Sequence, residues 1–220
     1  MEFRRVINID DERLAKRAAK GTVSIVDDEA HILESLQALI EYEGYLCLTY
    51  ASVAEFLVGN ELPRFYGPRC ILTDLSMPKM DGLALQAKLP SDSDQPVIFM
   101  SGVNNVRQTA QAFRNGALNF LPKPIRDVDL FAAIEEALEE SAIFQKHEQW
   151  RTEQAARIAL LTERERFLIK LLPTGMSIKE MGEQMNISER GVKHHKKNLM
   201  DKLQIRTVFE LVRLQREGLL

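Results

Sequence analysis

Residues 23–50 read VSIVDDEAHILESLQALIEYEGYLCLTY, and the pattern in this segment indicates the fold class. It begins and ends with short apolar runs rich in β-branched and aromatic residues, at 23–26 and 46–50, which predict two strands. Between them, apolar residues recur every three or four positions from Ile32 to Ile40, which predicts a helix with one apolar face that Gly44 can end. A strand, a helix and a second strand in this order indicate a parallel pair.

The same alternation continues along the chain. Further strand-like runs follow at 70–74, 97–101 and 118–121, so that five strands are expected. Parallel neighbours have to be joined by crossover segments, and we therefore expect a doubly wound, five-stranded parallel sheet of the α/β class with helices on both faces. Burial of both faces explains why the strands are apolar almost throughout.

Composition places the chain in an ordinary class. Of its 220 residues, 45% are hydrophobic and 28% charged, with a formal net charge of −3, which excludes collagen-like, mucin-like and low-complexity proteins. No apolar run approaches the roughly 18 residues of a membrane span, and charges alternate over 1–20 where a signal peptide would be apolar, so a cytoplasmic location is expected. Cys47 and Cys70 lie in apolar runs without a metal-binding spacing and are expected in the core.

The chain after the last expected strand is suited to helices. Neither glycine nor proline occurs between Pro124 and Pro173. We expect the last helix of the sheet domain, with Leu130, Ile134 and Leu138 on one face, to continue as a helical connector over 134–157. A flexible polar linker is the alternative, because frequent Glu and Gln suit both states.

Polar side chains follow the strands where ligands bind in open parallel sheets, at the carboxyl ends. Asp27 and Asp28 follow the first strand, Asp74 ends the third, Ser101 ends the fourth, and Lys123 follows the fifth. Each residue by itself is more often part of a turn or a helix cap. Their joint placement at successive strand ends favours one shared site.

The residue types at these ends indicate phosphoryl chemistry. Carboxylate oxygens without His or Cys favour a hard cation such as Mg²⁺. Such an ion and Lys123 can neutralise phosphoryl oxygens, Ser101 can donate a hydrogen bond, and one carboxylate can attack phosphorus. Asp74 is the candidate nucleophile because it is the single carboxylate that ends the central strand. A Gly-rich phosphate loop, a Ser-His-Asp arrangement and a cysteine nucleophile are not found in the sequence.

The last sixty residues predict a basic helical module. Residues 161–220 carry 12 basic and 8 acidic side chains. Thr162 with Glu165 forms a capping box, Ser177 caps a second helix, and Ser188 starts a third. These helices fit a helix-turn-helix whose last member enters the major groove of DNA.

The third of these helices has two faces. Its apolar residues Val192, Leu199 and Leu203 share one face at 100° per residue. A separate face carries the residues Arg190, Lys193, His194 and Lys197, and Lys196 borders the apolar stripe. A solvated surface is the alternative reading of such a basic face.

Four ordered motifs over 21–133 resemble a known family: VSIVDDEAHILESL, ILTDLSMPKMDG, VIFMSG and GALNFLPKP. They are similar to the receiver domain of two-component response regulators, which has a flavodoxin-like fold. The resemblance implies that a sensor histidine kinase phosphorylates Asp74. It also implies that Asp27, Asp28, Asp74 and the backbone carbonyl of Ser76 bind Mg²⁺. By the same resemblance Ser101 and Lys123 bind the phosphoryl group, and Phe120 is the aromatic residue whose rotamer accompanies the switch.

The tail LTERERFLIKLLPTGMSIKEMGEQMNISERGVKHHKKNLMDKL, at 161–203, resembles the LuxR-type DNA-binding domain over about 158–220. The whole chain is similar to FixJ/NarL-type transcriptional regulators. The resemblance implies that Lys193 and Lys197 contact DNA with His194 beside them, whereas His195 matches a largely structural position. Gly191 departs from the family pattern, which has Thr there, and costs about 1 kcal/mol of helix propensity.

We therefore divide the chain into an N-terminal extension (1–20), a receiver (21–133), a helical linker (134–157) and a DNA-binding domain (158–220). The expected function is phosphorylation-dependent regulation of transcription, without enzymatic activity of its own, by a dimer that binds paired half-sites. One alternative is a constitutive DNA-binding protein whose receiver responds to a partner or ligand without phosphorylation. Another is an acyl-phosphate phosphatase. For 1–20, the alternating charges fit a helix, an arm or a misplaced start codon.

Overall fold

The structure is a computed structural model that describes residues 12–59, 67–90, 92–102 and 106–220. The chain divides into two compact units, of which the first ends at Gln145 and the second begins at Lys146. Residues 1–11, the first part of the expected extension, lie outside the described residues. Within the described ranges, no helix is long and apolar enough to cross a membrane.

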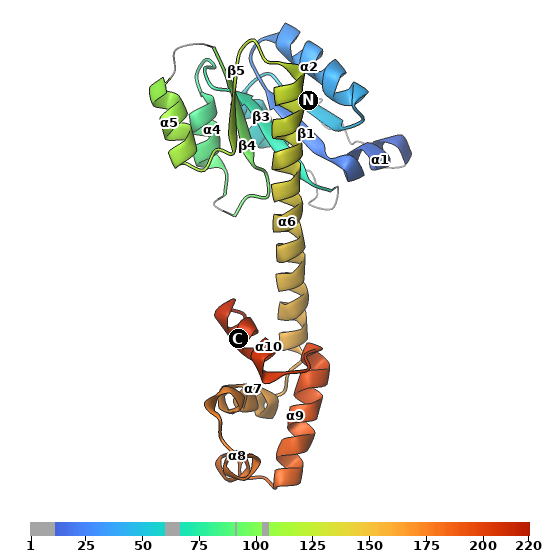
Figure 1. Ribbon diagram of the computed structural model, residues 1–220, viewed down its shortest axis with the longest axis vertical. Coiled ribbons are helices and arrows are strands. Elements are labelled where there is room, and N and C mark those ends of the chain that lie inside the picture. The colour runs from blue at the N-terminus through green and yellow to red at the C-terminus, as the bar shows by residue number, and fades with distance from the viewer. Residues whose placement is uncertain (1–11, 60–66, 91, 103–105) are drawn as a thin grey trace. The chain divides into compact units, whose positions relative to one another are not determined.

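The first unit is built on the expected parallel sheet (Figure 1). Its strand order is β2-β1-β3-β4-β5, and every neighbouring pair is parallel. Such an order, with the first strand inside the sheet, is that of a doubly wound fold, which confirms the predicted fold class. The strands are β1 (Thr22–Val26), β2 (Leu46–Tyr50), β3 (Arg69–Asp74), β4 (Val97–Ser101) and β5 (Asn119–Pro122).

Helices cover both faces of this sheet, and each face has its own apolar core. One core combines buried residues of α2 and α6, such as Ile40 and Ile134, with one face of the strands. The other combines residues of α3, α4 and α5, such as Phe56, Leu85 and Ala112, with the opposite face. The helices are α1 (Glu12–Lys20), α2 (Ala30–Tyr42), α3 (Val53–Gly59), α4 (Gly82–Lys88), α5 (Val106–Arg114) and α6 (Asp127–Ala159).

Helix α6 is one uninterrupted helix of 33 residues. Leu130, Ile134 and Leu138 are buried on its inner face, as the periodicity predicts. The segment 134–157, for which the sequence leaves a helix and a flexible linker open, is helical throughout. The helix begins in the first unit and ends in the second.

The described part of the extension, 12–20, is helix α1, and it is attached to the first unit. Arg17 Nη1 lies 3.4 Å from Glu41 Oε2 near the end of α2. Lys20 Nζ donates to the carbonyl oxygen of Glu43 and lies 3.9 Å from the centroid of the Tyr45 ring. The basic side chains Arg17 and Lys20 thus attach helix α1 to the end of α2 and the start of β2.

Both cysteines are buried free thiols. Burial raises the pKa of Cys47 to about 12 and raises the pKa of Cys70 as well. Neither thiol ionises near neutral pH, which agrees with the prediction that both are core residues.

The second unit is a small helical bundle around one apolar core. The capping boxes at Thr162 and Ser177 are present, and Ser188 Oγ accepts from the amide of Gly191. A further helix, α10, which the sequence reading did not include, begins with a third capping box at Thr207. The elements are α7 (Glu163–Leu171), the 3₁₀ turn η1 (Leu172–Thr174), α8 (Ile178–Met185), α9 (Glu189–Leu203) and α10 (Val208–Arg216).

Candidate functional site

Three of the predicted site residues meet at the carboxyl edge of the sheet. Lys123 Nζ lies 2.6 Å from Asp74 Oδ1 and 3.1 Å from Asp27 Oδ2. The Asp27 side chain is fully buried, that of Asp74 is 10% exposed and that of Lys123 is 24% exposed. The ammonium therefore bridges two carboxylates that end or follow neighbouring strands, and its side chain is the most exposed of the three.

Each carboxylate is held by a backbone amide as well as by the ammonium. Asp27 Oδ1 accepts a hydrogen bond of 2.9 Å from the amide of Glu29. Asp74 Oδ2 accepts one of 2.7 Å from the amide of Ser76. Both side chains are thereby fixed in orientation where the chain turns after β1 and β3.

Burial and the ion pair set the protonation of this group. Burial raises the pKa of Asp27, and hydrogen bonds from Glu29 and Lys123 offset only part of that rise. Burial by itself would lower the pKa of Lys123, but its hydrogen bonds to Asp74 and Asp27 outweigh this and raise it. Lys123 is consequently a permanent positive charge at neutral pH.

The remaining predicted residues lie around this group. Ser101 is buried at the end of β4, and its carbonyl oxygen accepts a 2.7 Å hydrogen bond from the amide of Lys123. Phe120 is half-buried in β5 and pairs with Phe99 of β4. Asp28, next to Asp27, is exposed to solvent. Of the three carboxylates expected to converge, Asp27 and Asp74 are brought together through their contacts with Lys123.

The oxygen atoms of this edge suit a hard cation. In the described ranges, no three His, Cys, Asp or Glu side chains are grouped so that they could hold a metal ion. The buried carboxylates of Asp27 and Asp74 nevertheless both offer oxygen donors. This donor set, without nitrogen or sulfur, fits Mg²⁺ with retained waters.

In the second unit, α9 presents the predicted basic face. Val192, Leu199 and Leu203 are fully buried. The residues expected on the other face, Arg190, Lys193, His194 and Lys197, are all exposed, and Lys196 is half-buried at its border. The sequence reading missed Asn198, whose Nδ2 lies 3.1 Å from Nε2 of His194; the spacing of four residues on one helix is the signal that could have found it.

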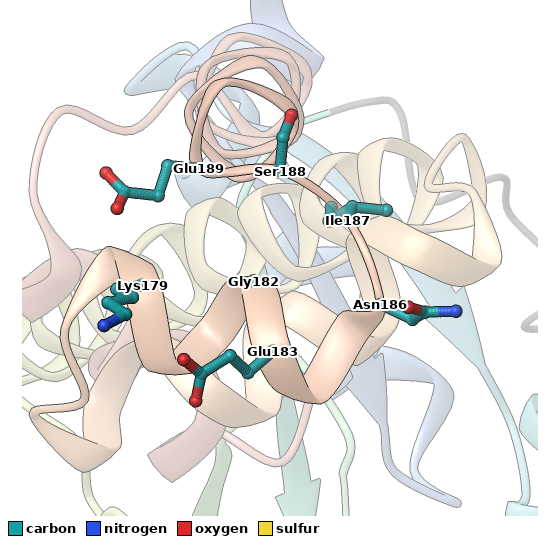
Figure 2. A pocket seen from close by; sticks show the side chains of 7 residues that line it. All are labelled: Lys179, Gly182, Glu183, Asn186, Ile187, Ser188 and Glu189. Atoms are coloured by element: carbon teal, nitrogen blue, oxygen red, sulfur yellow. The ribbon is translucent and has the colours of Figure 1, made fainter.

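An open cavity of about 460 Å³ lies where α8 meets the start of α9 (Figure 2). Lys179, Gly182 and Glu183 line it from α8, and Ser188 and Glu189 line it from the other side. Figure 2 shows Ser188 and Glu189 at the first turn of α9, above the α8 residues. The cavity therefore lies in the angle between α8 and α9.

Comparison with known proteins assigns the chain to a family. A model of the response regulator receiver domain matches residues 23–135, and a model of bacterial regulatory proteins of the luxR family matches residues 159–215. The chain belongs to the LuxR-type response regulators. With a receiver and a DNA-binding domain of this kind, it is a transcriptional response regulator.

Relatives match this response regulator over most of its length and most of theirs. It is 33% identical to the transcriptional regulatory protein FixJ of Bradyrhizobium diazoefficiens, over 91% of this chain and 98% of that protein. It is 32% identical to the response regulator protein TmoT of Ectopseudomonas mendocina, over 89% and 88%. The solved structure of the response regulator StyR is similar with a TM-score of 0.77 and 30% identity, over 90% of this chain and 98% of that one.

Proposed function

We propose that Asp74 accepts a phosphoryl group from a sensor histidine kinase and that this controls DNA binding by the second unit. The observation that carries the proposal is the position of Lys123, whose ammonium bridges Asp74 and the buried Asp27. An ammonium fixed beside a carboxylate at the carboxyl edge of a parallel sheet is an arrangement suited to phosphoryl transfer, because it pairs a nucleophile with a charge that can bind phosphoryl oxygens.

The proposed transfer uses groups of this chain at each point. A carboxylate oxygen of Asp74 attacks phosphorus, and the bond from phosphorus to the histidine nitrogen of the kinase breaks, so that an acyl phosphate forms. The histidine leaves as a neutral imidazole, and the acylated side chain of Asp74 no longer carries a negative charge. Lys123 then pairs with the phosphoryl oxygens, which bring their own two negative charges. Ser101 supplies a hydroxyl at the end of the neighbouring strand.

Asp27, Asp28, Asp74 and the backbone carbonyl of Ser76 would hold Mg²⁺ in this site. The ion, when bound, supplies positive charge that keeps the incoming phosphoryl oxygens and the carboxylates from repelling one another.

We propose that the switch runs through Ser101 and Phe120. A dianion on Asp74 gives the Ser101 hydroxyl and the Lys123 ammonium a new partner, which draws the end of β4 inward. Phe120, half-buried on the adjacent strand, then turns into the space that Ser101 leaves. The altered surface allows a second copy of the chain to discriminate between the two states, which is the basis for dimerisation.

For the second unit we propose that α9 enters the major groove. Lys193 and Lys197 contact DNA, with His194 between them, and the residues Arg190 and Lys196 extend the basic face. The exposure of these side chains and the burial of the opposite face support this assignment. Two copies would read two half-sites, as the two-fold symmetry of a dimer requires.

The domain boundaries are also proposals: an extension (1–20), a receiver (21–133), a linker (134–157) and a DNA-binding domain (158–220). In this scheme the chain regulates transcription and does not turn over external substrates.

The test is incubation of the full chain with acetyl phosphate and Mg²⁺, followed by intact-mass measurement and DNA titration. We expect the gain of one phosphoryl group, its loss in Asp74→Asn, and its retention in the control Asp92→Asn, an exposed aspartate of the same unit. Phosphorylation of Asp74→Asn would defeat the assignment. Phosphorylation of the natural chain without any change in dimerisation or DNA affinity would favour a constitutive DNA-binding protein instead.

A further inference from the structure

At the edge of the sheet opposite Asp74, Arg69 and Asp94 form a buried ion pair. Nε and Nη2 of Arg69 donate to both carboxylate oxygens of Asp94 at 2.7 to 3.1 Å. The side chains are only 12% and 4% exposed. Burial by itself would raise the pKa of Asp94, but hydrogen bonds from Arg69 and Gln145 outweigh it and lower the pKa, so the pair is charged at neutral pH.

Helix α6 is fastened to this pair. Gln145 Nε2 donates to Asp94 Oδ2 at 2.8 Å and to the carbonyl oxygen of Gly67 at 3.0 Å. One turn earlier, the fully buried hydroxyl of Ser141 accepts a 2.9 Å hydrogen bond from the amide of Arg69. We call Arg69, Asp94, Ser141 and Gln145 the α6 anchor. These residues hold α6 on the first unit as far as Gln145, the last residue of that unit.

Helix α1 packs against the backbone of Gly67, beside the α6 anchor. A Cβ atom on Gly67 would lie 2.4 Å from the carbonyl oxygen of Ala18, so the backbone of α1 packs directly on the residue to which Gln145 donates. Ala18 itself is buried. The N-terminal helix thus limits the movement of one of the two acceptors of Gln145.

The anchor lies on the two strands that carry the proposed phosphoryl site. Arg69 is the first residue of β3, and Asp74 is its last. Asp94 precedes β4 by three positions, and Ser101 is the last residue of β4. The two strands pair directly, from Ile71 with Val97 onward. Because a single close-packed strand is stiff along its length, a shift of Ser101 towards Asp74 also moves the other end of β4. Asp94, just before β4, then changes its position relative to Arg69 of β3.

We propose that Gln145 is a positioning residue through which α6 senses the relative position of β3 and β4, so that phosphorylation of Asp74 changes how firmly residues 141–145 are held. This rests on the proposed function, since the signal is the phosphoryl group. Gln145 bonds to the β4 side through Asp94, whereas Ser141 bonds to the β3 side through Arg69. A relative movement of the strands cannot keep both bonds unchanged. Since α6 is continuous into the second unit, the altered hold reaches Lys146 through the helix itself.

The experiment is hydrogen exchange of the full chain, with and without acetyl phosphate and Mg²⁺, followed at the amides of 139–146. In the natural chain we expect phosphorylation to change these exchange rates about threefold or more, which is the effect of one hydrogen bond. In Gln145→Ala the same amides exchange about threefold faster without phosphorylation, and the response to phosphorylation is lost although the phosphoryl mass is still gained. Alanine keeps the helix intact because it has the highest helix propensity.

Gln149→Ala is the matched control. Gln149 lies one turn further along α6, is exposed, and bonds only to Glu153 of the same helix among the contacts that the structure describes. In Gln149→Ala, phosphorylation should change the exchange rates of the amides of 139–146 as much as it does in the natural chain. Unchanged exchange at 139–146 in a fully phosphorylated natural chain would overturn the coupling, as would a normal response in Gln145→Ala. A natural chain that gains no phosphoryl mass would instead overturn the proposed function, and the coupling with it.

Discussion

Lys123 Nζ lies 2.6 Å from Asp74 Oδ1, closer than it lies to the fully buried Asp27. One ammonium therefore balances two carboxylates that fold together at the carboxyl edge of the sheet. The side chain that stabilises the resting site is the same one that is proposed to bind the phosphoryl group.

Replacement of Lys123 by Met should reduce the stability of the first unit. It leaves two closely spaced carboxylates, one of them fully buried, without their counter-charge, and such a loss costs on the order of 3 kcal/mol. Thermal unfolding followed by circular dichroism would measure it, with Lys88→Met, an exposed lysine of α4, as the control. Equal melting temperatures for the two variants would show that the bridge contributes nothing to stability.

In the second unit, Lys202 Nζ lies 2.7 Å from Glu165 Oε2, and the Glu165 side chain is 2% exposed. Lys202→Met should destabilise this unit by about 2 kcal/mol at pH 7, because the buried carboxylate loses a charged partner. The single tryptophan, Trp150, packs against the core of this unit, so its fluorescence during urea unfolding reports the loss. Lys170→Met, an exposed lysine of α7, should be neutral.

The same pair predicts a pH dependence. Burial by itself would raise the pKa of Glu165, but hydrogen bonds from Lys202 and Thr162 outweigh it and lower the pKa in the folded chain. The folded state then binds fewer protons than the unfolded state, so the stabilisation is complete above the unfolded value of about 4.3 and is lost as the pH falls through the folded pKa. The difference between the natural chain and Lys202→Met should therefore narrow in acid; a difference that grows there would contradict the prediction.

Gly191→Ala should stabilise the second unit by up to about 1 kcal/mol, the difference in helix propensity. A Cβ at this position would lie 3.5 Å from Ile187, which is ordinary contact. Gly182→Ala should instead destabilise the unit, because its Cβ would lie 2.8 Å from the carbonyl oxygen of Ile187, which is closer than ordinary contact. Urea unfolding should move the two variants in opposite directions, and a destabilised Gly191→Ala would mean that the glycine is needed for the fold.

Lys193→Ala and Lys197→Ala should each weaken binding to duplex DNA and lower the slope of log affinity against log salt by about 1, as the loss of one phosphate contact does. Fluorescence anisotropy at several salt concentrations measures both quantities. Lys170→Ala should leave the slope unchanged. A slope that stays constant in all three variants would show that neither Lys193 nor Lys197 contacts a DNA phosphate.

Much of the fold and of the site follows from local patterns. The apolar runs and the helical period between 23 and 50 determine a parallel pair, and the ends of parallel strands meet at one edge, which brings Asp27, Asp74 and Lys123 together. The pattern does not separate Asp27 from Asp28, because it does not tell which of two adjacent carboxylates turns into the site. The folded chain shows that Asp27 is buried in the site and that Asp28 is exposed to solvent.

The α6 anchor could not be predicted for a different reason. Arg69, Asp94 and Gln145 are far apart in the sequence, and a local pattern does not indicate which polar residues of distant elements will meet. Helix α10 did carry a local signal, since Thr207 and Glu210 have the spacing of a capping box.

A crystal structure of the full chain with Mg²⁺ and a beryllofluoride group, which imitates a phosphoryl group, would show directly whether Asp74 accepts phosphoryl groups. We predict beryllofluoride bound to an oxygen of Asp74, with the Lys123 ammonium moved onto its fluorine atoms and the Ser101 hydroxyl within hydrogen-bond distance. An unmodified Asp74 with Lys123 still bridging to Asp27, at saturating concentrations of both reagents, would contradict it.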